Sequence, residues 1–181
     1  MLSKVANVAA FQITWWVSVL GAADSNRWIG PALAACILLL HVLMVADRLA
    51  MMKVIGLVGG VGYLVDSVLG LAGVLEFQGG NFGGRLLAPL WLLGLWLVFA
   101  TTLGSSLSWL SLRPRLAAIL GAVFGPVSYY AGFKLGALHL EAPHLRSLFM
   151  IAIVWSLLLP LAFRADRYFV SAGAAFRRLT V

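Results

Sequence analysis

The chain has 181 residues, of which 62% are hydrophobic and 10% charged, and its mean hydropathy is +1.01. A soluble domain averages about 45–50% apolar and about 25% charged residues, so this composition excludes a water-soluble globular protein. The net charge of +7 is scattered between apolar segments and forms no basic stripe, so no nucleic-acid partner is expected. The chain is predicted to be a polytopic, multi-pass membrane protein.

Six apolar segments follow one another, each close to the roughly 20 residues that a spanning helix requires. They predict an all-α fold, a bundle of six transmembrane helices, at residues 5–22, 29–46, 54–75, 87–107, 116–138 and 145–163. Short connections indicate a single transmembrane domain over residues 1–181, with a basic tail at residues 164–181. The first segment favours a retained helix over a secretory signal, because its apolar run exceeds the usual length of about 7–15 residues.

The lysines and arginines between the segments predict the orientation of the bundle. Loops on the side of the two termini hold nine of these residues and the opposite loops hold three, with Lys134 left inside the fifth segment. The nine are Lys4, Arg48, Lys53, Arg113, Arg115, Arg164, Arg167, Arg177 and Arg178, and the three are Arg27, Arg85 and Arg146. Because cytoplasmic loops carry the excess of positive charge, both termini are expected in the cytoplasm.

A carboxyl group in the third segment is the main candidate for a functional residue. Asp66 stands about 12 residues into the segment, which is about 18 Å from its start. A charge at the bilayer centre costs about 2.5–3.5 kcal/mol on insertion scales, so Asp66 must be neutral, paired or turned to a polar cavity. A functional role and a structural hydrogen-bonding role both stay open. Other segments carry uncharged groups at comparable depth, and the predicted ligand-binding set is Asp66, Ser128, Gln12, Thr101, Tyr129 and Trp16.

Glycines four residues apart indicate where helices approach one another closely. Gly56 and Gly60 in the third segment, and Gly121 and Gly125 in the fifth, predict that both segments lie in the interior of the bundle. Pro126 follows in the middle of the fifth segment. It removes a backbone N–H group and frees a carbonyl one turn earlier, so the predicted polar layer includes backbone as well.

No motif specifies a reaction, a metal or a cofactor. His139, Glu141 and His144 cluster in a predicted loop, but Pro143 breaks the helical spacing that would bring them together, so no metal site is expected. The serines and threonines of the fourth segment lack a clear base, and His41 is the one candidate. No catalytic residue and no cofactor are predicted.

Tryptophan-rich blocks and a Gly-Pro in mid-segment extend over nearly the whole chain. The blocks are Asn7, Phe11-Gln12 and Trp16; Asp66-Ser67; Pro89-Leu90-Trp91, Leu95-Trp96 and Phe99-Ala100-Thr101-Thr102-Leu103; Ser106-Leu107 and Trp109-Leu110; Gly121-Ala122, Gly125-Pro126, Ser128-Tyr129, Ala131-Gly132 and Leu135-Gly136. In these blocks the chain resembles a family of bacterial inner-membrane proteins known as domain of unknown function 2878.

The resemblance implies a location in the bacterial inner (cytoplasmic) membrane and no established activity. It also implies a connection with lipid, because relatives are encoded near lipid-modifying enzymes. The chain departs from the family pattern at one position, since a histidine often precedes the serine at position 106 and this chain has Ser105 there. That departure puts any histidine-dependent chemistry of the relatives in doubt for this protein.

Three functions remain open from the sequence. The leading one is non-enzymatic, namely binding or moving a lipid or small apolar molecule through a mid-membrane polar pocket. The second is a membrane-embedded enzyme that modifies lipid, with Asp66 and His41 as acid–base groups. The third is an accessory subunit of a membrane enzyme complex. The expected partners are therefore membrane lipids or a membrane protein.

Overall fold

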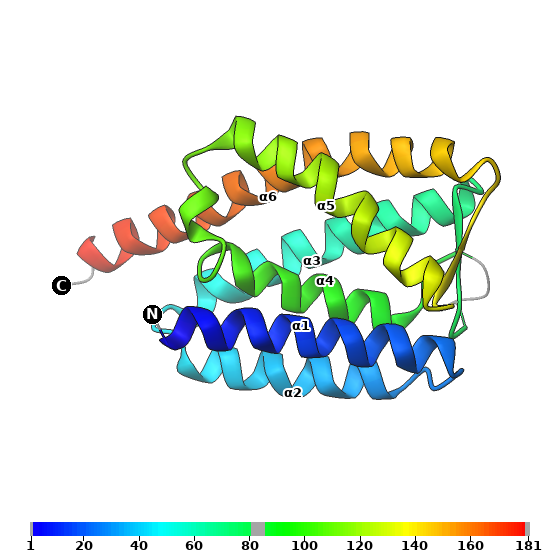
Figure 1. The fold of residues 1–181 in the computed structure, drawn as a ribbon. Coiled ribbons are helices and arrows are strands. Elements are labelled where there is room, and N and C mark those ends of the chain that lie inside the picture. The colour runs from blue at the N-terminus through cyan, green and yellow to red at the C-terminus, as the bar shows by residue number, and fades with distance from the viewer. Residues whose placement is uncertain (1, 81–85, 180–181) are drawn as a thin grey trace.

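The computed structural model describes residues 2–80 and 86–179, and these residues confirm an all-helical fold (Figure 1). The helices are α1 (Leu2–Ala23), α2 (Ile29–Met44), α3 (Arg48–Leu71), α4 (Leu90–Leu103), α5 (Pro114–Lys134) and α6 (His144–Leu179), with a 3-10 turn η1 (Ser108–Leu110) and two strands, β1 (Leu75–Phe77) and β2 (Leu138–Leu140). Arg85, which was counted for the orientation, and the last two residues of the predicted tail lie outside the described residues.

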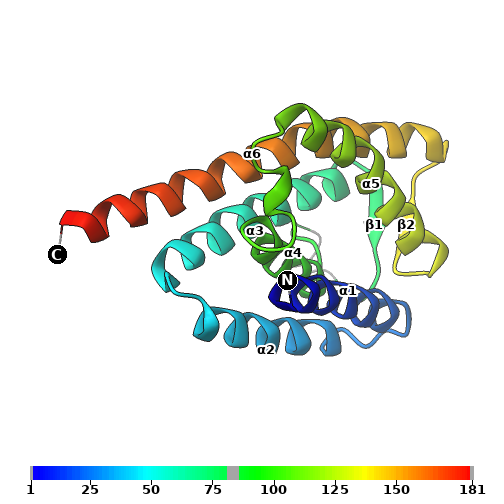
Figure 2. The same cartoon turned by 60° about the vertical axis from the view of Figure 1, so that its left-hand side comes forward.

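The fourth helix is the centre of the bundle. Ten of the fourteen residues of α4 are buried, and the helix packs against α1, α2, α3 and α6. α5 packs along α6 on the other side of the bundle, and the chain passes through α1, α2 and α3 around α4 (Figure 2). Both termini lie at the same end of the molecule (Figure 1). α6 continues well beyond the bundle, so that residues 164–179 extend this helix instead of forming a separate segment.

Four of the described helices are long and apolar enough to cross a membrane, which supports a membrane protein. They are α1 over Lys4–Ala23, α3, α5 and α6 over His144–Val170. α2 and α4 are apolar but shorter, with 16 and 14 residues. At 1.5 Å per residue they are about 24 Å and about 21 Å long, which is less than the roughly 30 Å of a hydrocarbon core.

The start of α4 explains part of the difference from the predicted segment, since the helix begins at Leu90 instead of residue 87 and ends at Leu103 instead of residue 107. Ala88 precedes it in extended chain, and its backbone groups are bound by two side chains of α3. Ser67 Oγ accepts the Ala88 N–H at 3.0 Å, and the Tyr63 hydroxyl donates to the Ala88 carbonyl at 2.5 Å. Buried backbone groups that have such partners do not need a helix. Hydropathy alone cannot distinguish this buried extended segment from one more helical turn.

Glycines provide the close helix contacts, but in α3 they are not the predicted ones. A Cβ atom at Gly56 or Gly60 would meet nothing within 4 Å, so the prediction of a close contact there is wrong. The contacts are at Gly59 and Gly62, where a Cβ would lie 2.5 Å from Leu97 and 2.2 Å from the ring of Trp96. Both glycine pairs fit a helical spacing, and the sequence does not say which face meets the neighbouring helix.

The glycines predicted to make close contacts in α5 do so. A Cβ atom at Gly121 would lie 2.3 Å from the backbone oxygen of Trp155 in α6, and one at Gly125 would lie 2.5 Å from the ring of the same residue. The two helices therefore touch backbone to backbone at this point. The contact sets the depth at which Trp155 enters the bundle.

A short antiparallel strand pair closes the end of the bundle opposite the termini. β1 pairs with β2 so that Glu76 stands across from His139. The histidine is exposed in the strand, whereas the ring of His144 at the start of α6 lies 4.9 Å from that of Phe133. The strand pair was not predicted, because three-residue strands joined across more than 60 residues leave no periodic signal.

Candidate functional site

Asp66 is the polar centre of the bundle, with 1% of its surface exposed. It lies in the half of α3 nearest the strand pair, 18 residues after Arg48 and thus about 27 Å along the helix. Trp96 of α4 donates its indole N–H to Oδ2 at 2.6 Å, and the Tyr129 hydroxyl of α5 donates to Oδ1 at 2.5 Å. Two neutral donors thus bind the two carboxylate oxygens, and one side chain links three helices.

Stacked aromatic rings extend from this centre toward α6. The rings of Trp96 and Trp155 lie 4.9 Å apart and are nearly parallel, with an angle of 19° between their planes. Phe99 meets both edge-on, with centroids 5.6 Å away in each case. Such geometries are the favoured ones for aromatic pairs. Because Gly62 and Gly125 leave the space that the two indoles occupy, the glycines and the aromatic stack form one packing unit.

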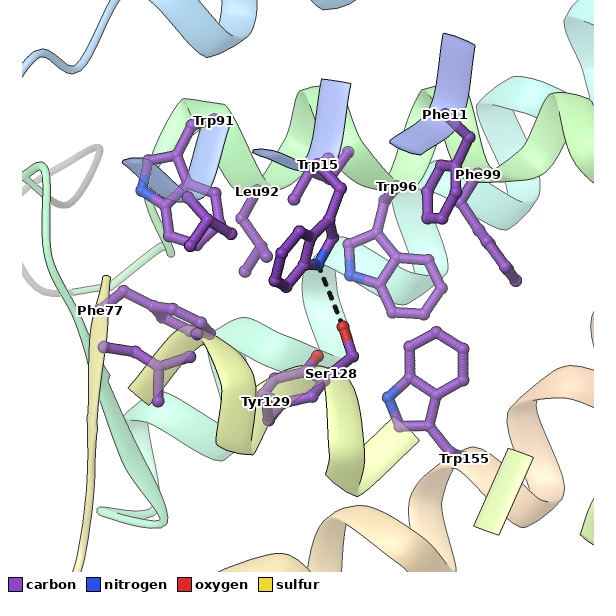
Figure 3. A pocket seen from close by; sticks show the side chains of 14 residues that line it. Phe11, Trp15, Phe77, Trp91, Leu92, Trp96, Phe99, Ser128, Tyr129 and Trp155 are labelled. Carbon is purple, nitrogen blue, oxygen red and sulfur yellow. Dashed lines mark hydrogen bonds between the residues drawn. The ribbon is translucent and has the colours of Figure 1, made fainter. Parts of the chain in front are cut away.

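A small inner cavity of about 70 Å³ lies against this stack (Figure 3). Eight of its fourteen lining residues are aromatic, and Ser128 and Tyr129 provide hydroxyl groups. Trp15 of α1 points toward Ser128 of α5, and its indole N–H donates to the serine Oγ at 3.1 Å (Figure 3). The cavity is therefore an apolar chamber with a few placed polar atoms, which is the usual character of a small-molecule site.

A larger groove of about 550 Å³ adjoins the inner cavity. Its walls are α1 and α5, with the end of α4, residues 106–110 and part of α6 contributing the rest of its lining. Trp15 and Ser128 line both spaces, so their hydrogen bond stands between the groove and the inner cavity. The groove opens between two helices that face the surroundings of the bundle, and in a bilayer these surroundings are lipid chains.

The predicted ligand-binding residues fall into three places. Ser128 and Tyr129 line the inner cavity, and Gln12, Trp16 and Ser128 line the groove. Asp66 lines neither space. It accepts hydrogen bonds from Trp96 and Tyr129, which both line the inner cavity.

Thr101 also lines neither space. Its hydroxyl donates to the Val98 carbonyl at 2.7 Å and accepts from the Asn7 amide at 3.1 Å. Asn7 in turn accepts from the Ser106 hydroxyl at 2.7 Å. This polar chain joins α1 to the end of α4, and it gives Thr101 a structural role in the described contacts.

Sequence reasoning did not select the aromatic residues that form most of the cavity wall. Trp15, Trp96 and Trp155 lie within helices, whereas tryptophans of membrane proteins are concentrated at the two interfaces. An indole away from the interface needs an acceptor for its N–H group. Trp15 has Ser128 and Trp96 has Asp66 as acceptors. The signal in the sequence was therefore a tryptophan in the middle of one segment together with a polar residue in the middle of another.

The residues proposed as an acid–base pair are far apart. His41 lies in the last turn of α2, close to the start of α3, whereas Asp66 lies about 27 Å along α3 from that start. The two side chains are therefore about 20 Å or more apart by helix rise, which is beyond proton transfer through one bridging water. Lys134 also does not meet Asp66, since its ammonium lies 5.5 Å from the Tyr130 ring centre on the exposed side of α5.

Comparison with known proteins identifies the family and nothing beyond it. No curated protein and no solved structure matches the chain. A family model described as "Protein of unknown function (DUF2878)" matches residues 4–161, which include the polar centre, the inner cavity and the groove. The resemblance in the tryptophan-rich blocks is thus confirmed, and the chain belongs to the DUF2878 family.

Proposed function

We propose that this protein binds a lipid or another small apolar molecule in the groove between α1 and α5. The observation that carries the proposal is the groove itself, because about 550 Å³ of mostly apolar space lies between two helices at the surface of the bundle. Pockets of about 300–1,000 Å³ with apolar walls and few polar groups are typical of small-molecule sites. Gln12 and Ser128 are the polar groups that would orient the ligand within the groove.

The proposal includes the orientation of the molecule in a bacterial inner membrane, with six passes and both termini in the cytoplasm. Two observations support it. Both termini lie at one end of the bundle, and the loops on that side hold nine lysines and arginines whereas the opposite loops hold three. The short helix α4 would complete its pass through the flanking chain before it, whose backbone groups at Ala88 are bound by side chains of α3.

Cysteine labelling in intact cells tests this orientation. In a chain with Cys36 replaced by serine, Asp24→Cys between α1 and α2 is expected to react with a membrane-impermeant thiol reagent added from outside. Lys53→Cys near the start of α3 is expected to react only after the membrane is permeabilised. Both native side chains are exposed, so access is set by the side of the membrane. The opposite pattern would reverse the orientation, and labelling of both from outside would contradict the fold.

A bulky side chain inside the groove tests the binding function. Ala131 lines the groove and is half-buried, so Ala131→Trp is expected to fill the space and lower the amount of co-purifying ligand several-fold. Val123 lies on the same helix, is 50% exposed and lines neither space, so Val123→Trp serves as the control with the same added ring. The measurement is native mass spectrometry of each protein after purification in mild detergent.

The outcomes of that experiment separate binding of a small molecule from the accessory-subunit function. A bound small molecule in the wild type and in Val123→Trp, but not in Ala131→Trp, supports the proposal. Equal adducts in all three proteins, or none in the wild type, contradict it. A stoichiometric protein instead would favour the accessory subunit, and the exposed face at Gly56 and Gly60 is the observation that keeps this alternative. The enzyme alternative has lost its acid–base pair through the separation of His41 and Asp66.

A further inference from the structure

One end of the groove differs chemically from the rest. Ser106 and Trp109 line it at the end where both termini lie, and Trp109 is 51% exposed. An exposed tryptophan of this kind is typical of the headgroup region of a bilayer. At the same end the Lys4 ammonium donates to the Ser108 hydroxyl at 3.1 Å. An ammonium group has three donors, and this contact uses one of them.

Lys4 lies in line with the groove wall on α1. Residues of α1 that line the groove include Val8, Gln12 and Trp15, and Lys4 precedes Val8 by four residues. Side chains three or four residues apart lie on the same face of a helix. The lysine therefore belongs to the groove face of α1, one turn closer to the end of the bundle than the first apolar wall residue.

The two segments that form this end of the groove, which we call its mouth, carry positively charged side chains and no negatively charged ones. Residues 2–12 and 104–120 contain Lys4, Arg113 and Arg115, and neither segment contains an aspartate or a glutamate. The carboxyl closest to Gly104 is that of Asp166 on α6, which is 6% exposed and stands beside Arg167. An anionic group arriving at the mouth would thus meet cations.

The length of the groove matches one leaflet. Along α5 its lining runs from Leu120 to Ala131, which is about 16 Å at 1.5 Å per residue. The hydrocarbon core of a bilayer is about 30 Å thick, so the groove covers about half of it. The hydrogen bond between Trp15 and Ser128 separates the groove from the inner cavity. A chain that enters at the end where the termini lie would therefore have about 16 Å of apolar wall along α5.

We propose that the groove holds one acyl chain of an anionic phospholipid from the leaflet nearest the termini, with the phosphate at the Lys4 ammonium. This inference rests on the proposed function and specifies its ligand class. The apolar walls receive the chain, and the lysine ammonium donates to the phosphate oxygens. Ser108 holds that ammonium in place, since its hydroxyl accepts from Lys4 at 3.1 Å and donates to the Ser105 carbonyl at 2.8 Å. Selection among lipids then comes from the headgroup charge, because the residues that line the groove are uncharged and the segments that form its mouth carry only cations.

The test compares phosphatidylglycerol with phosphatidylcholine of the same acyl chains. Each lipid is titrated into delipidated full-length protein in mild detergent at low salt, and the one-to-one complex is measured by native mass spectrometry. Wild type is expected to prefer phosphatidylglycerol by about fivefold or more, which is the contribution of about one lysine near an anionic surface. Lys4→Gln is expected to remove most of this preference and to weaken phosphatidylcholine binding less than phosphatidylglycerol binding, because choline already compensates the phosphate charge in the former.

Lys53→Gln is the matched control, because Lys53 is an exposed lysine near the same end of the bundle but lies on α3, away from the groove. It is expected to keep the preference of the wild type. Equal binding of both lipids, or an equal effect of the two lysine variants, overturns the inference while leaving the proposed function intact. Binding of both lipids that does not change in Ala131→Trp removes the proposed function and the inference with it.

Discussion

Asp66→Ala is expected to lower the free energy of unfolding by about 2–4 kcal/mol. The substitution leaves the Trp96 indole N–H and the Tyr129 hydroxyl without their acceptors, and a buried unsatisfied donor costs about 1–3 kcal/mol. It also breaks the pair of hydrogen bonds that joins α3, α4 and α5. The measurement is the unfolding midpoint in mixed micelles as the fraction of denaturing detergent is raised, followed by tryptophan fluorescence.

Asp66→Asn is the informative comparison for this prediction. An indole N–H can only donate, so the amide oxygen of asparagine has to face Trp96. The amide NH₂ then faces Tyr129, whose hydroxyl can accept instead of donating. We therefore expect a loss of about 1 kcal/mol or less, well below that of alanine. If alanine and asparagine variants unfold at the wild-type midpoint, the hydrogen bonds of Asp66 do not stabilise the bundle.

The same variants separate a structural from a functional role of Asp66. The carboxyl lines neither the inner cavity nor the groove, so any effect on ligand binding has to pass through Trp96 and Tyr129. An asparagine that holds both rings is expected to bind ligand as the wild type does. Loss of ligand in a stable Asp66→Asn protein would instead show that the carboxylate itself acts on the ligand.

The membrane class and the order of helices could be predicted because they depend on composition and on apolar length. These are properties of each segment by itself, and lipid demands them of every spanning helix. The helix ends could not be predicted in the same way. α4 begins at Leu90 instead of residue 87, because Tyr63 and Ser67, more than 20 residues away, satisfy the backbone of Ala88.

Sequence reasoning identified the site residue whose burial in a membrane costs free energy, and it did not identify the apolar residues that are common in such segments. A carboxyl deep in a span requires an explanation, and Asp66 is indeed the centre of a hydrogen-bond network. Trp96 and Trp155 are compatible with an apolar segment by hydropathy, so only the need of a buried indole N–H for an acceptor could have indicated that they form part of the cavity wall. Which helices face one another depends on contacts between distant segments, and so the groove between α1 and α5 has no signature within either sequence segment.

Gly121→Ala is expected to destabilise the bundle by about 1–3 kcal/mol, in the range of core overpacking. The added methyl group would lie 2.3 Å from the Trp155 carbonyl oxygen, and a backbone atom in a helix cannot rotate away. α5 and α6 would therefore have to move apart. Because the ring of Trp155 stacks on that of Trp96, this displacement should also disturb the inner cavity and reduce ligand binding.

Gly56→Ala provides the matched control for this last prediction. Gly56 is also a helical glycine of a long apolar helix, but a Cβ atom there meets nothing within 4 Å. Alanine is the better helix former by about 1 kcal/mol, so this variant should be as stable as the wild type or slightly more stable. Midpoints for both variants in the same detergent titration give the comparison. Equal midpoints would mean that α5 and α6 are not in backbone contact, whereas a selective loss in Gly56→Ala would reveal a partner on the exposed face of α3.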